Sequence, residues 1–291
     1  MQVNRSCLIC SSTYVDQYQP FYNAHGLLKC TSCKFIFMEK IPSEQELTDY
    51  YAQYSYSEDA YLSPLTIKSY NLLLDEFEKY RKHNRILDVG CGRGWFLQEA
   101  KKRGWVVYGT EYSSTALDLC NNEGIKMHSG ALTENAFESN YFDVVTSFEV
   151  LEHINNPQEE IKSIYKFLRR GGLFYITTPN FNSYLRYQLK EKYNIICYPE
   201  HLSYYTRKSL KYLLSNNNFK TNKVLTTGIS LTRLRTSKNN GSEAIISEVS
   251  SDEKLRKRIS KNRILKLTKN LVNRALTLFG VGITLKGYFT K

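Results

Sequence analysis

The stretch RILDVGCGRGWFLQEA, residues 85–100, decides how the rest of the chain is interpreted, because an apolar run leads directly into three closely spaced glycines. A strand that ends in a glycine turn before a helix lets a ligand approach the backbone at Gly90, Gly92 and Gly94. Dinucleotide enzymes space their glycines as G-x-G-x-x-G, whereas the third glycine here comes one residue earlier. Asp88, just before the turn, disfavours a pyrophosphate and suits a cationic ligand that carries an amino acid group.

From Arg85 to the end of the chain, apolar runs alternate with helical patterns, which is typical of a parallel sheet with helices on its faces. We expect strands at residues 85–90, 106–111, 125–130, 142–149, 173–180, 223–230 and 282–291. We expect helices at residues 66–82, 95–103, 114–122 and 157–169. Gly171 and Gly172 are expected to end the last of these helices. The second strand ends at Glu111, whose carboxylate can accept two hydrogen bonds from ribose hydroxyls.

Four of the seven cysteines form two pairs, CLIC and CTSC, with nineteen residues between the pairs. Two residues between paired cysteines allow a tight turn to direct both thiolates to one tetrahedral Zn²⁺. Cys7, Cys10, Cys30 and Cys33 are therefore predicted to form a zinc ribbon over residues 1–42. Four thiolates close the coordination sphere, so the metal would be structural. Free thiols or two disulfides are the alternative, which the lack of a secretion signal disfavours.

Composition favours a globular protein with anionic partners. The chain has 291 residues, of which 42% are hydrophobic, and its net charge is +12. Because the N-terminus lacks a leader pattern and the sequence holds no run of about 18 apolar residues, we expect a cytoplasmic protein without a transmembrane segment. Residues 236–291 carry 12 Lys and Arg against 4 Asp and Glu, so most of the positive charge lies there. Nucleic acid, phospholipid or a phosphorylated substrate would match this charge.

The basic region predicts an amphipathic helix at about residues 252–279, inserted between the last two strands within residues 236–279. Its apolar positions, spaced by three or four residues, include Ile264, Leu267, Leu271, Ala275 and Leu278. Three interpretations stay open. The helix packs on the domain and leaves a solvated basic face, it lies on an anionic membrane as a peripheral contact at the inner membrane, or it contacts nucleic acid.

Residues 43–82 form a tyrosine-rich connector between the ribbon and the sheet domain, which starts at residue 83. Ser43 is suited to cap a helix that carries Glu46 in its first turn. The tyrosines of this connector either close over a ligand as a lid or pack the connector on the domain. They are Tyr50, Tyr51, Tyr54, Tyr56 and Tyr61.

With the glycine turn, Asp88, Glu111 and the segment YFDVVTSFEVLEHINNP, the sequence resembles the class I S-adenosylmethionine-dependent methyltransferases. The resemblance covers about residues 85–180. It implies a Rossmann-like α/β sheet of seven strands, whose last strand is antiparallel and inserted between the fifth and sixth. It also implies contacts of the glycine segment with the methionine part of S-adenosylmethionine, of Glu111 with the ribose, of a pair after the third strand with the adenine, and of the fourth strand end with the sulfonium. The residues so implied are Asp88, Gly90, Cys91, Gly92, Gly94, Glu111, Ala131, Leu132 and Phe148.

More narrowly, the ribbon, the connector, EVLEHI and YPEHLSYYTRKSLKYLLSNNNF together look like the zinc-ribbon methyltransferases of bacterial surface-polysaccharide and natural-product pathways. This resemblance implies methylation of a hydroxyl of a sugar or other small metabolite. One departure is that SGALTENAFESNYFDVV lacks the acidic residue that many members place after the third strand, so the adenine amino group would rely on backbone partners.

Methyl transfer to a hydroxyl is helped by a general base, and His153 and His201 are the candidates by residue type. His201 could instead only tether its loop. Glu149, Glu152 and His153 would share one face if the turn after the fourth strand is helical. Some related quinone O-methyltransferases are thought to bind a divalent cation with such a run, and a plain helix start is the alternative.

Other functions compete with methylation of a small acceptor or glycan. An RNA methyltransferase would use the ribbon and the basic helix to hold nucleic acid, although no N-P-P-Y signature of base methylation is present. A non-catalytic cofactor-binding protein would keep the fold alone. A nicotinamide oxidoreductase is disfavoured by the glycine spacing.

Overall fold

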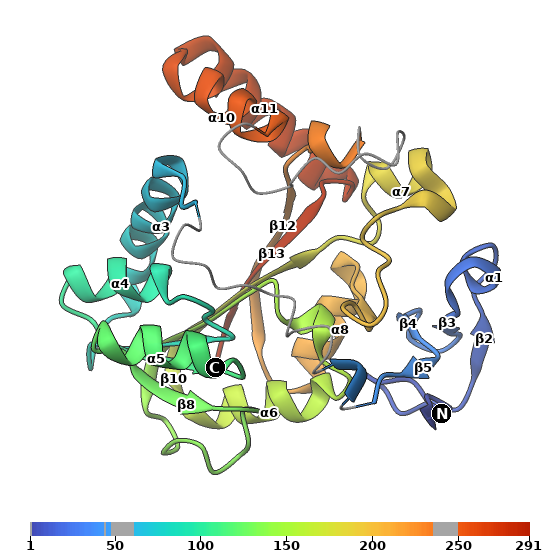
Figure 1. Cartoon of the computed structure of the whole chain (residues 1–291), viewed down its shortest axis with the longest axis horizontal. Helices are drawn as coiled ribbons and strands as arrows, with labels where there is room; N and C mark the ends of the chain where they lie inside the picture. The colour runs from blue at the N-terminus through green and yellow to red at the C-terminus, as the bar shows by residue number, and fades with distance from the viewer. Residues whose placement is uncertain (1, 44, 48–60, 235–249) are drawn as a thin grey trace.

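The computed structural model describes residues 2–43, 45–47, 61–234 and 250–291, and its centre is one seven-stranded sheet (Figure 1). The strands lie in the order β12-β13-β10-β9-β6-β7-β8. Their bounds are β6 (Arg85–Val89), β7 (Val106–Glu111), β8 (Lys126–Ser129), β9 (Phe142–Phe148), β10 (Leu168–Pro179), β12 (Lys220–Thr227) and β13 (Thr284–Thr290). β13 pairs antiparallel with both β10 and β12. The predicted Rossmann-like order, with the last strand inserted and reversed, is confirmed.

Helices cover both faces of this sheet because successive residues of each strand point to opposite sides. Ile86 packs with α3 (Pro64–Phe77) and α4 (Trp95–Lys102) on one face. Its neighbour Leu87 belongs to the core that includes side chains of α6 (Pro157–Phe167) and α8 (Arg207–Asn216). The helix α5 (Ser114–Asn122) adds Cys120 to the first core. Because β6, β7, β8, β9 and β10 pair in parallel, their carboxyl ends lie at one edge of the sheet.

Three of the predicted helices are bounded differently. The helix expected at residues 66–82 is α3, which ends at Phe77 and is followed by a short 3-10 helix at Glu78–Tyr80. α6 ends at Phe167 and β10 starts at once, so Gly171 and Gly172 do not end the helix. They lie inside β10, where the register with β9 shifts, and Gly171 has a φ of 71°. The basic segment forms two helices rather than one, α10 (Ser251–Lys261) and α11 (Arg263–Phe279). Asn262 separates the two helices, because its side chain accepts hydrogen bonds from the first turn of α11 and so starts a new helix.

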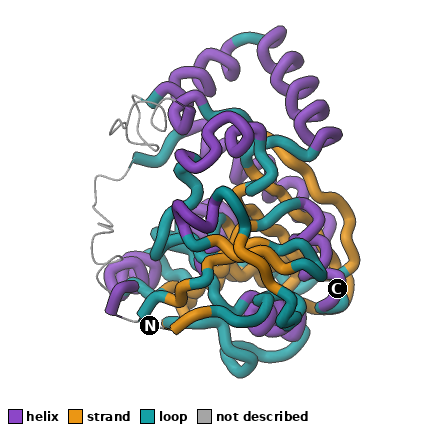
Figure 2. Tube along the Cα trace, turned by 90° about the vertical axis from the view of Figure 1, so that its right-hand side faces the viewer, coloured by secondary structure: helices purple, strands orange, loops and turns teal. Residues whose placement is uncertain are grey.

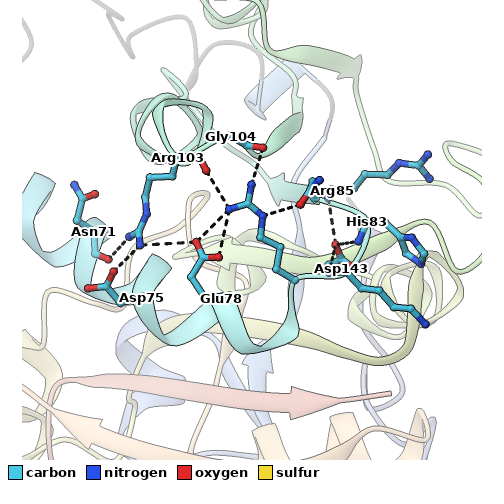
Figure 3. A network of polar contacts seen from close by, with 11 residues as sticks. Asn71, Asp75, Glu78, His83, Arg85, Arg103, Gly104 and Asp143 are labelled. Atoms are coloured by element: carbon cyan, nitrogen blue, oxygen red, sulfur yellow. Dashed lines mark hydrogen bonds and ion pairs between the residues drawn. The ribbon is translucent and has the colours of Figure 1, made fainter.

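Polar contacts fasten the amino edge of the sheet, as Figure 3 shows. The carboxylate of Asp143, at the start of β9, accepts hydrogen bonds from the backbone N–H groups of Lys82 and His83. It also forms an ion pair with Arg169. The Arg81 guanidinium donates to the carbonyl oxygens of residues 103 and 104. This network joins α3 and the short helix η1 (Glu78–Tyr80) to the sheet at the edge away from the glycine turn.

The N-terminal segment folds as a small sheet that includes a strand from the second half of the chain. β2 (Val15–Gln17), β3 (Leu27–Cys30) and β4 (Ile36–Met38) are extended by β11 (Ser203–Tyr204), which pairs antiparallel with β4. A further pair joins β1 (Gln2–Val3) to β5 (Lys40–Ile41). The short helix α1 (Phe21–His25) packs through Phe21 against Phe181 and Leu185, near α7 (Tyr184–Leu189) and η3 (Lys190–Lys192). The ribbon segment is thus continuous with the sheet domain.

The connector is described only at its ends. Ser43 and Glu46 exchange the two hydrogen bonds of a capping box, as predicted. Residues 48–60, with four of the five predicted lid tyrosines, and residues 235–249, with the start of the predicted insertion, lie outside the described residues. Tyr61 is described, and its hydroxyl donates to Glu253 of α10 rather than covering the glycine turn. In the described part of the chain, every helix is too short or too polar to cross a bilayer.

Candidate active site

The glycine turn connects the carboxyl end of β6 to α4 and is tightly packed. Gly90 and Gly94 have φ values of 64° and 69°, which residues that carry a Cβ atom rarely adopt. A Cβ atom on Gly90 would lie 2.6 Å from Val150 Cγ2, and one on Gly94 would lie 2.6 Å from Ile125 Cδ1. Gly92, between them, also has a positive φ of 52°. These positions therefore require glycine, and the predicted strand–turn–helix is confirmed.

Asp88 is buried at the end of β6, directly before this turn. Its Oδ1 atom accepts a hydrogen bond of 2.6 Å from Thr146 Oγ1 on β9. Burial raises the pKa of Asp88, the Thr146 hydroxyl lowers it, the Glu111 carboxylate raises it, and the resulting pKa is about 7. A cationic group placed beside Asp88 would favour its ionised form. Asp88 is therefore suited to bind an ammonium group at this edge.

Glu111 ends β7 and its carboxylate reaches across to the glycine turn. Its Oε2 atom accepts a hydrogen bond from the backbone N–H of Gly92 at 2.9 Å. Its Oε1 atom accepts from the N–H groups of Tyr112 at 2.7 Å and Ser113 at 3.3 Å. A carboxylate offers about four acceptor positions. A ribose that binds both oxygens would therefore replace one of these backbone hydrogen bonds.

The other residues implied for the cofactor follow the same edge. Cys91 is half-buried, with its Sγ atom 4.0 Å from Met127 Sδ. After β8, Ala131 is exposed while Leu132 is buried in the core. Phe148 ends β9 and packs against the rings of α3, α4 and β10: those of Tyr70, Phe96 and Tyr175. The ring of Tyr70 joins this edge from the connector, and sequence periodicity alone did not single it out.

The two candidate histidines lie together. His153 belongs to η2 (Leu151–His153), which follows β9, and its ring centroid is 4.9 Å from that of His201. His153 Nδ1 lies 2.9 Å from the Glu200 carbonyl oxygen, and His201 Nδ1 lies 2.7 Å from that of Ile195. Since a carbonyl only accepts, each Nδ1 carries the proton and each Nε2 is left as an acceptor.

Burial lowers the pKa of both imidazoles. For His153, burial and the neighbouring His201 ring lower the pKa to about 4. For His201, burial is the main cause of a lowered pKa. Both rings are therefore neutral at neutral pH, and each Nε2 atom can take up a proton from a bound hydroxyl.

Glu152 completes a group of three potential metal ligands with these histidines. Ligand atoms of Glu152, His153 and His201 all lie within 4.8 Å of one another. Thr178 Oγ1 donates to Glu152 Oε2 at 2.9 Å and orients the carboxylate. Glu149, which was expected in this group, precedes η2 with a φ of 53°, so it does not share a helical face with the others. His201 takes its place, and three such ligands would leave positions open for a substrate or water.

A side-chain contact brings this group to the glycine turn, and backbone hydrogen bonds connect it to the ribbon. Val150, one residue before η2, packs directly on Gly90. On the other side, the Leu202 N–H donates to the Glu152 carbonyl at 2.8 Å. The Leu202 carbonyl in turn accepts from the N–H of Met38 in β4 at 2.9 Å. The ribbon strand therefore supports the loop that carries His201, a link for which the sequence offers no local signal.

The four ribbon cysteines converge as predicted. The Sγ atoms of Cys7 and Cys33 are 3.4 Å apart, and those of Cys10 and Cys30 are 3.6 Å apart. All four sulfur atoms lie within 4.8 Å of one another. A disulfide bond would be about 2.05 Å long. The separations instead approach the edge of about 3.8 Å in a tetrahedron with Zn–S bonds of about 2.3 Å. The donor set fits a tetrahedral thiophilic metal.

Solved structures share this fold. Geranyl diphosphate C-methyltransferase from Streptomyces coelicolor aligns with a TM-score of 0.55 at 15% identity, over 78% of this chain and 79% of that chain. A SAM-dependent methyltransferase from Archaeoglobus fulgidus aligns with a TM-score of 0.53 at 18% identity, over 78% of this chain and 93% of that chain. At these identities the likeness establishes the fold alone.

Curated relatives match a shorter part of the sequence. Ubiquinone biosynthesis O-methyltransferase of Coxiella burnetii is 31% identical over 115 residues, which cover 36% of this chain and 48% of the relative. The protein of the same name from Aeromonas salmonicida is 32% identical over 105 residues, covering 34% and 44%. The chain thus spans about half the length of the curated relatives it matches.

A sequence profile described as "Methyltransferase domain" matches residues 63–224, which is more than half of the chain. The matched range contains the glycine turn, Asp88, Glu111 and the group formed by Glu152, His153 and His201. The protein therefore belongs to this family of methyltransferase domains.

Proposed function

We propose that this protein transfers the methyl group of S-adenosylmethionine to an oxygen atom of a sugar or another small metabolite. The observation that carries the proposal is the contact of Val150 with Gly90. It joins the carboxylates of the glycine turn, which suit an ammonium group and a ribose, to the neutral histidine pair. Groups for binding a sulfonium amino acid and for accepting a proton thus share one edge of the sheet.

The residues present fit the cofactor by their chemistry. Bound S-adenosylmethionine supplies a methyl group that is activated by the positive sulfur. Asp88 would balance the charge of the amino acid part, and Glu111 would exchange a backbone partner for ribose hydroxyls. The aromatic rings around Phe148 would exclude water from this edge.

His201 is the proposed general base for the acceptor. Its Nδ1–H is held by the Ile195 carbonyl, so Nε2 would accept the proton that the attacking hydroxyl loses. His153, packed edge-on against it, would orient the ring of His201. The curated relatives are named O-methyltransferases, which supports an oxygen acceptor.

Thermal shift in the presence of S-adenosylhomocysteine, NAD and NADP tests the cofactor. A ligand that binds only the folded state raises its stability by mass action. We expect a shift with S-adenosylhomocysteine and none with the nicotinamide cofactors. A shift with NAD alone would overturn the proposal.

His201→Ala tests the base, with methyl transfer from labelled cofactor to a small-molecule extract as the assay. We expect turnover to fall by about 10²–10⁴-fold while the affinity for S-adenosylhomocysteine stays unchanged. His83→Ala is the matched control, because His83 is exposed at the opposite edge of the sheet. Loss of both properties to the same degree, or no loss, would contradict this role. Loss of turnover on chelation with the ribbon metal retained would instead assign a catalytic metal to Glu152, His153 and His201.

We also propose that the four ribbon cysteines bind one structural Zn²⁺. The convergence of their sulfur atoms supports this. With zinc bound there, the chain would resemble methyltransferases that carry an N-terminal zinc ribbon. Metal analysis of the purified protein tests it, with one zinc per chain as the expected result. A folded protein that holds no zinc as purified would contradict it.

A further inference from the structure

One helix of the described chain exposes a continuous apolar stripe. Ile264, Leu267, Leu271 and Leu278 of α11 are 73%, 65%, 63% and 77% exposed, and Phe279 at its end is 72% exposed. Spacings of three, four and seven residues align the first four on one side of the helix. α11 has no buried residue along its 17 residues. Such a stripe on a protein surface marks a contact with something outside the chain.

The other side of α11 is fastened to β12 by polar groups. Thr277 Oγ1 donates to the Thr226 carbonyl at 2.9 Å, and Thr226 Oγ1 donates to the Leu276 carbonyl at 2.6 Å. The Gly228 N–H donates to Asn273 Oδ1 at 3.0 Å. These bonds fix the rotation of the helix about its axis. The stripe is therefore held away from the sheet, which excludes the interpretation that the helix buries its apolar side on the domain.

Together α10 and α11 form a helical arm, residues 251–279, which carries a strong positive charge. Residues 251–279 include nine Lys and Arg against two Asp and Glu. Asp252 and Glu253 each accept a hydrogen bond of 2.5 Å from a serine hydroxyl of a neighbouring segment, so both acids are engaged within the protein. Arg263 and Arg274 border the stripe, since each lies three or four residues from one of its leucines. The exposed surface thus combines aliphatic and cationic groups.

We propose that α11 lies flat on an anionic lipid surface, with its apolar stripe among the acyl chains and its basic residues at the headgroups. A lipid surface satisfies both properties of the helix at once. A second copy of the chain would bring two helical arms with the same excess of seven positive charges together, which is repulsive. Nucleic acid would draw on the basic groups and leave the stripe exposed to water.

The position of the arm connects this surface to the candidate site. Asn180, which follows β10 at the carboxyl edge of the sheet, donates to the carbonyl oxygens of Gly280 and Gly282 at 3.0 Å and 2.7 Å. α11 therefore ends at the edge that holds the glycine turn, and Figures 1 and 2 show α10 and α11 at one end of the molecule. Resting on the proposed function, this placement favours an acceptor that is itself held at a membrane by a lipid group.

Vesicle flotation tests the lipid contact with the full-length protein and without any cofactor. The probes are vesicles of phosphatidylcholine alone and vesicles of an equal mixture of phosphatidylcholine and phosphatidylglycerol. We expect the protein to float only with the second kind at low salt. A variant with Leu267→Ser, Leu271→Ser and Leu278→Ser should bind about a hundredfold more weakly, because the aliphatic groups are lost. The variant Arg263→Gln with Arg274→Gln should bind about tenfold more weakly.

Leu72→Ser is the matched control, because Leu72 is also exposed, at 57%, but lies on α3. It should leave flotation unchanged. The thermal shift with S-adenosylhomocysteine should be the same in all variants, so failure of the lipid contact and failure of the proposed function are distinguishable. No flotation with anionic vesicles, or equal flotation of the triple leucine variant, would overturn the proposal. Two further results would overturn it. One is a parent protein that is a dimer while the triple leucine variant is a monomer, and the other is binding of nucleic acid in place of lipid.

Discussion

The N-terminal ribbon and the C-terminal helical arm are both attached to the same sheet, yet they use their apolar residues in opposite ways. Phe35 and Phe37 of the ribbon are fully buried in the core that also holds Leu151 and Tyr205. Phe279 of the arm is 72% exposed. The ribbon is packed into the domain by burial and by strand pairing, whereas the arm is fastened by polar bonds and keeps its apolar side for a partner. Attachment to the domain therefore does not by itself show where a segment buries its surface.

This difference has a consequence for the candidate site. Strand β4 of the ribbon contacts the loop of His201 through the hydrogen bond between Met38 and Leu202. The arm is attached elsewhere: α11 bonds to the outer strand β12, and α10 bonds to Ser63 and Ser230. We therefore expect damage to the ribbon to reach both stability and the histidine pair, and damage to the arm to reach neither.

The largest effect is expected for a ribbon cysteine. Cys30→Ser removes one of four ligands of the proposed zinc site, so the free energy of unfolding should fall by about 5 kcal/mol together with loss of the metal. Urea unfolding and metal analysis of the same preparation measure both. Cys197→Ser, at a half-buried cysteine outside the cluster, should keep the zinc and most of the stability. If Cys30→Ser unfolds like the parent protein, the ribbon is not part of the cooperative core.

Phe37→Ala tests the ribbon without touching a metal ligand. The side chain is fully buried, and its ring centroid lies 5.9 Å from that of Phe35. Its truncation should cost about 3–5 kcal/mol, because the removed ring leaves a cavity. Urea unfolding measures the change, and zinc content should stay at the parent value. A cost below about 1 kcal/mol would mean that the ribbon and the sheet domain unfold separately.

The cofactor-binding part of this edge should not respond to changes in the arm, and its pH dependence tests this. Burial raises the pKa of Asp88 to about 7, so at lower pH the carboxyl is neutral. An ammonium group of the ligand favours the ionised form, so affinity for S-adenosylhomocysteine is full above pH 7 and should fall about tenfold for each unit below it. Calorimetric titration across this range measures the slope. Asp88→Asn should flatten the slope, and the triple leucine variant of α11 should retain it.

Much of the sheet follows from the sequence because buried parallel strands appear as apolar runs. β9 starts where expected, at Phe142, and α5 has the expected bounds. The prediction that Gly171 ends a helix is wrong. A glycine that ends a helix and a glycine at an irregularity in a strand look the same in the local sequence. The break at Asn262 does not follow from the sequence either. An asparagine inside a long helical pattern gives no local sign of whether it caps a new helix or continues the first one.

The site divides in the same way. Asp88 and Glu111 could be placed together from sequence, because the carboxyl ends of neighbouring parallel strands meet at one edge. The pairing of His153 with His201 could not, because it depends on Leu202 bonding to both Glu152 and the ribbon strand. The apolar spacing of the arm correctly predicts helical structure. It does not determine whether the apolar side packs on the protein or contacts a partner.

The smallest effect is expected for the arm, and it completes the comparison with Phe37. Phe279→Ala removes the same ring, but from a surface position at the end of α11. Because an exposed side chain leaves no cavity and loses few contacts, the free energy of unfolding should change by less than about 0.5 kcal/mol. Urea unfolding beside Phe37→Ala measures this, and flotation with anionic vesicles should weaken in the arm variant only. A large loss of stability would show that the arm buries this ring against the protein in solution, and the contrast between the two attachments would then disappear.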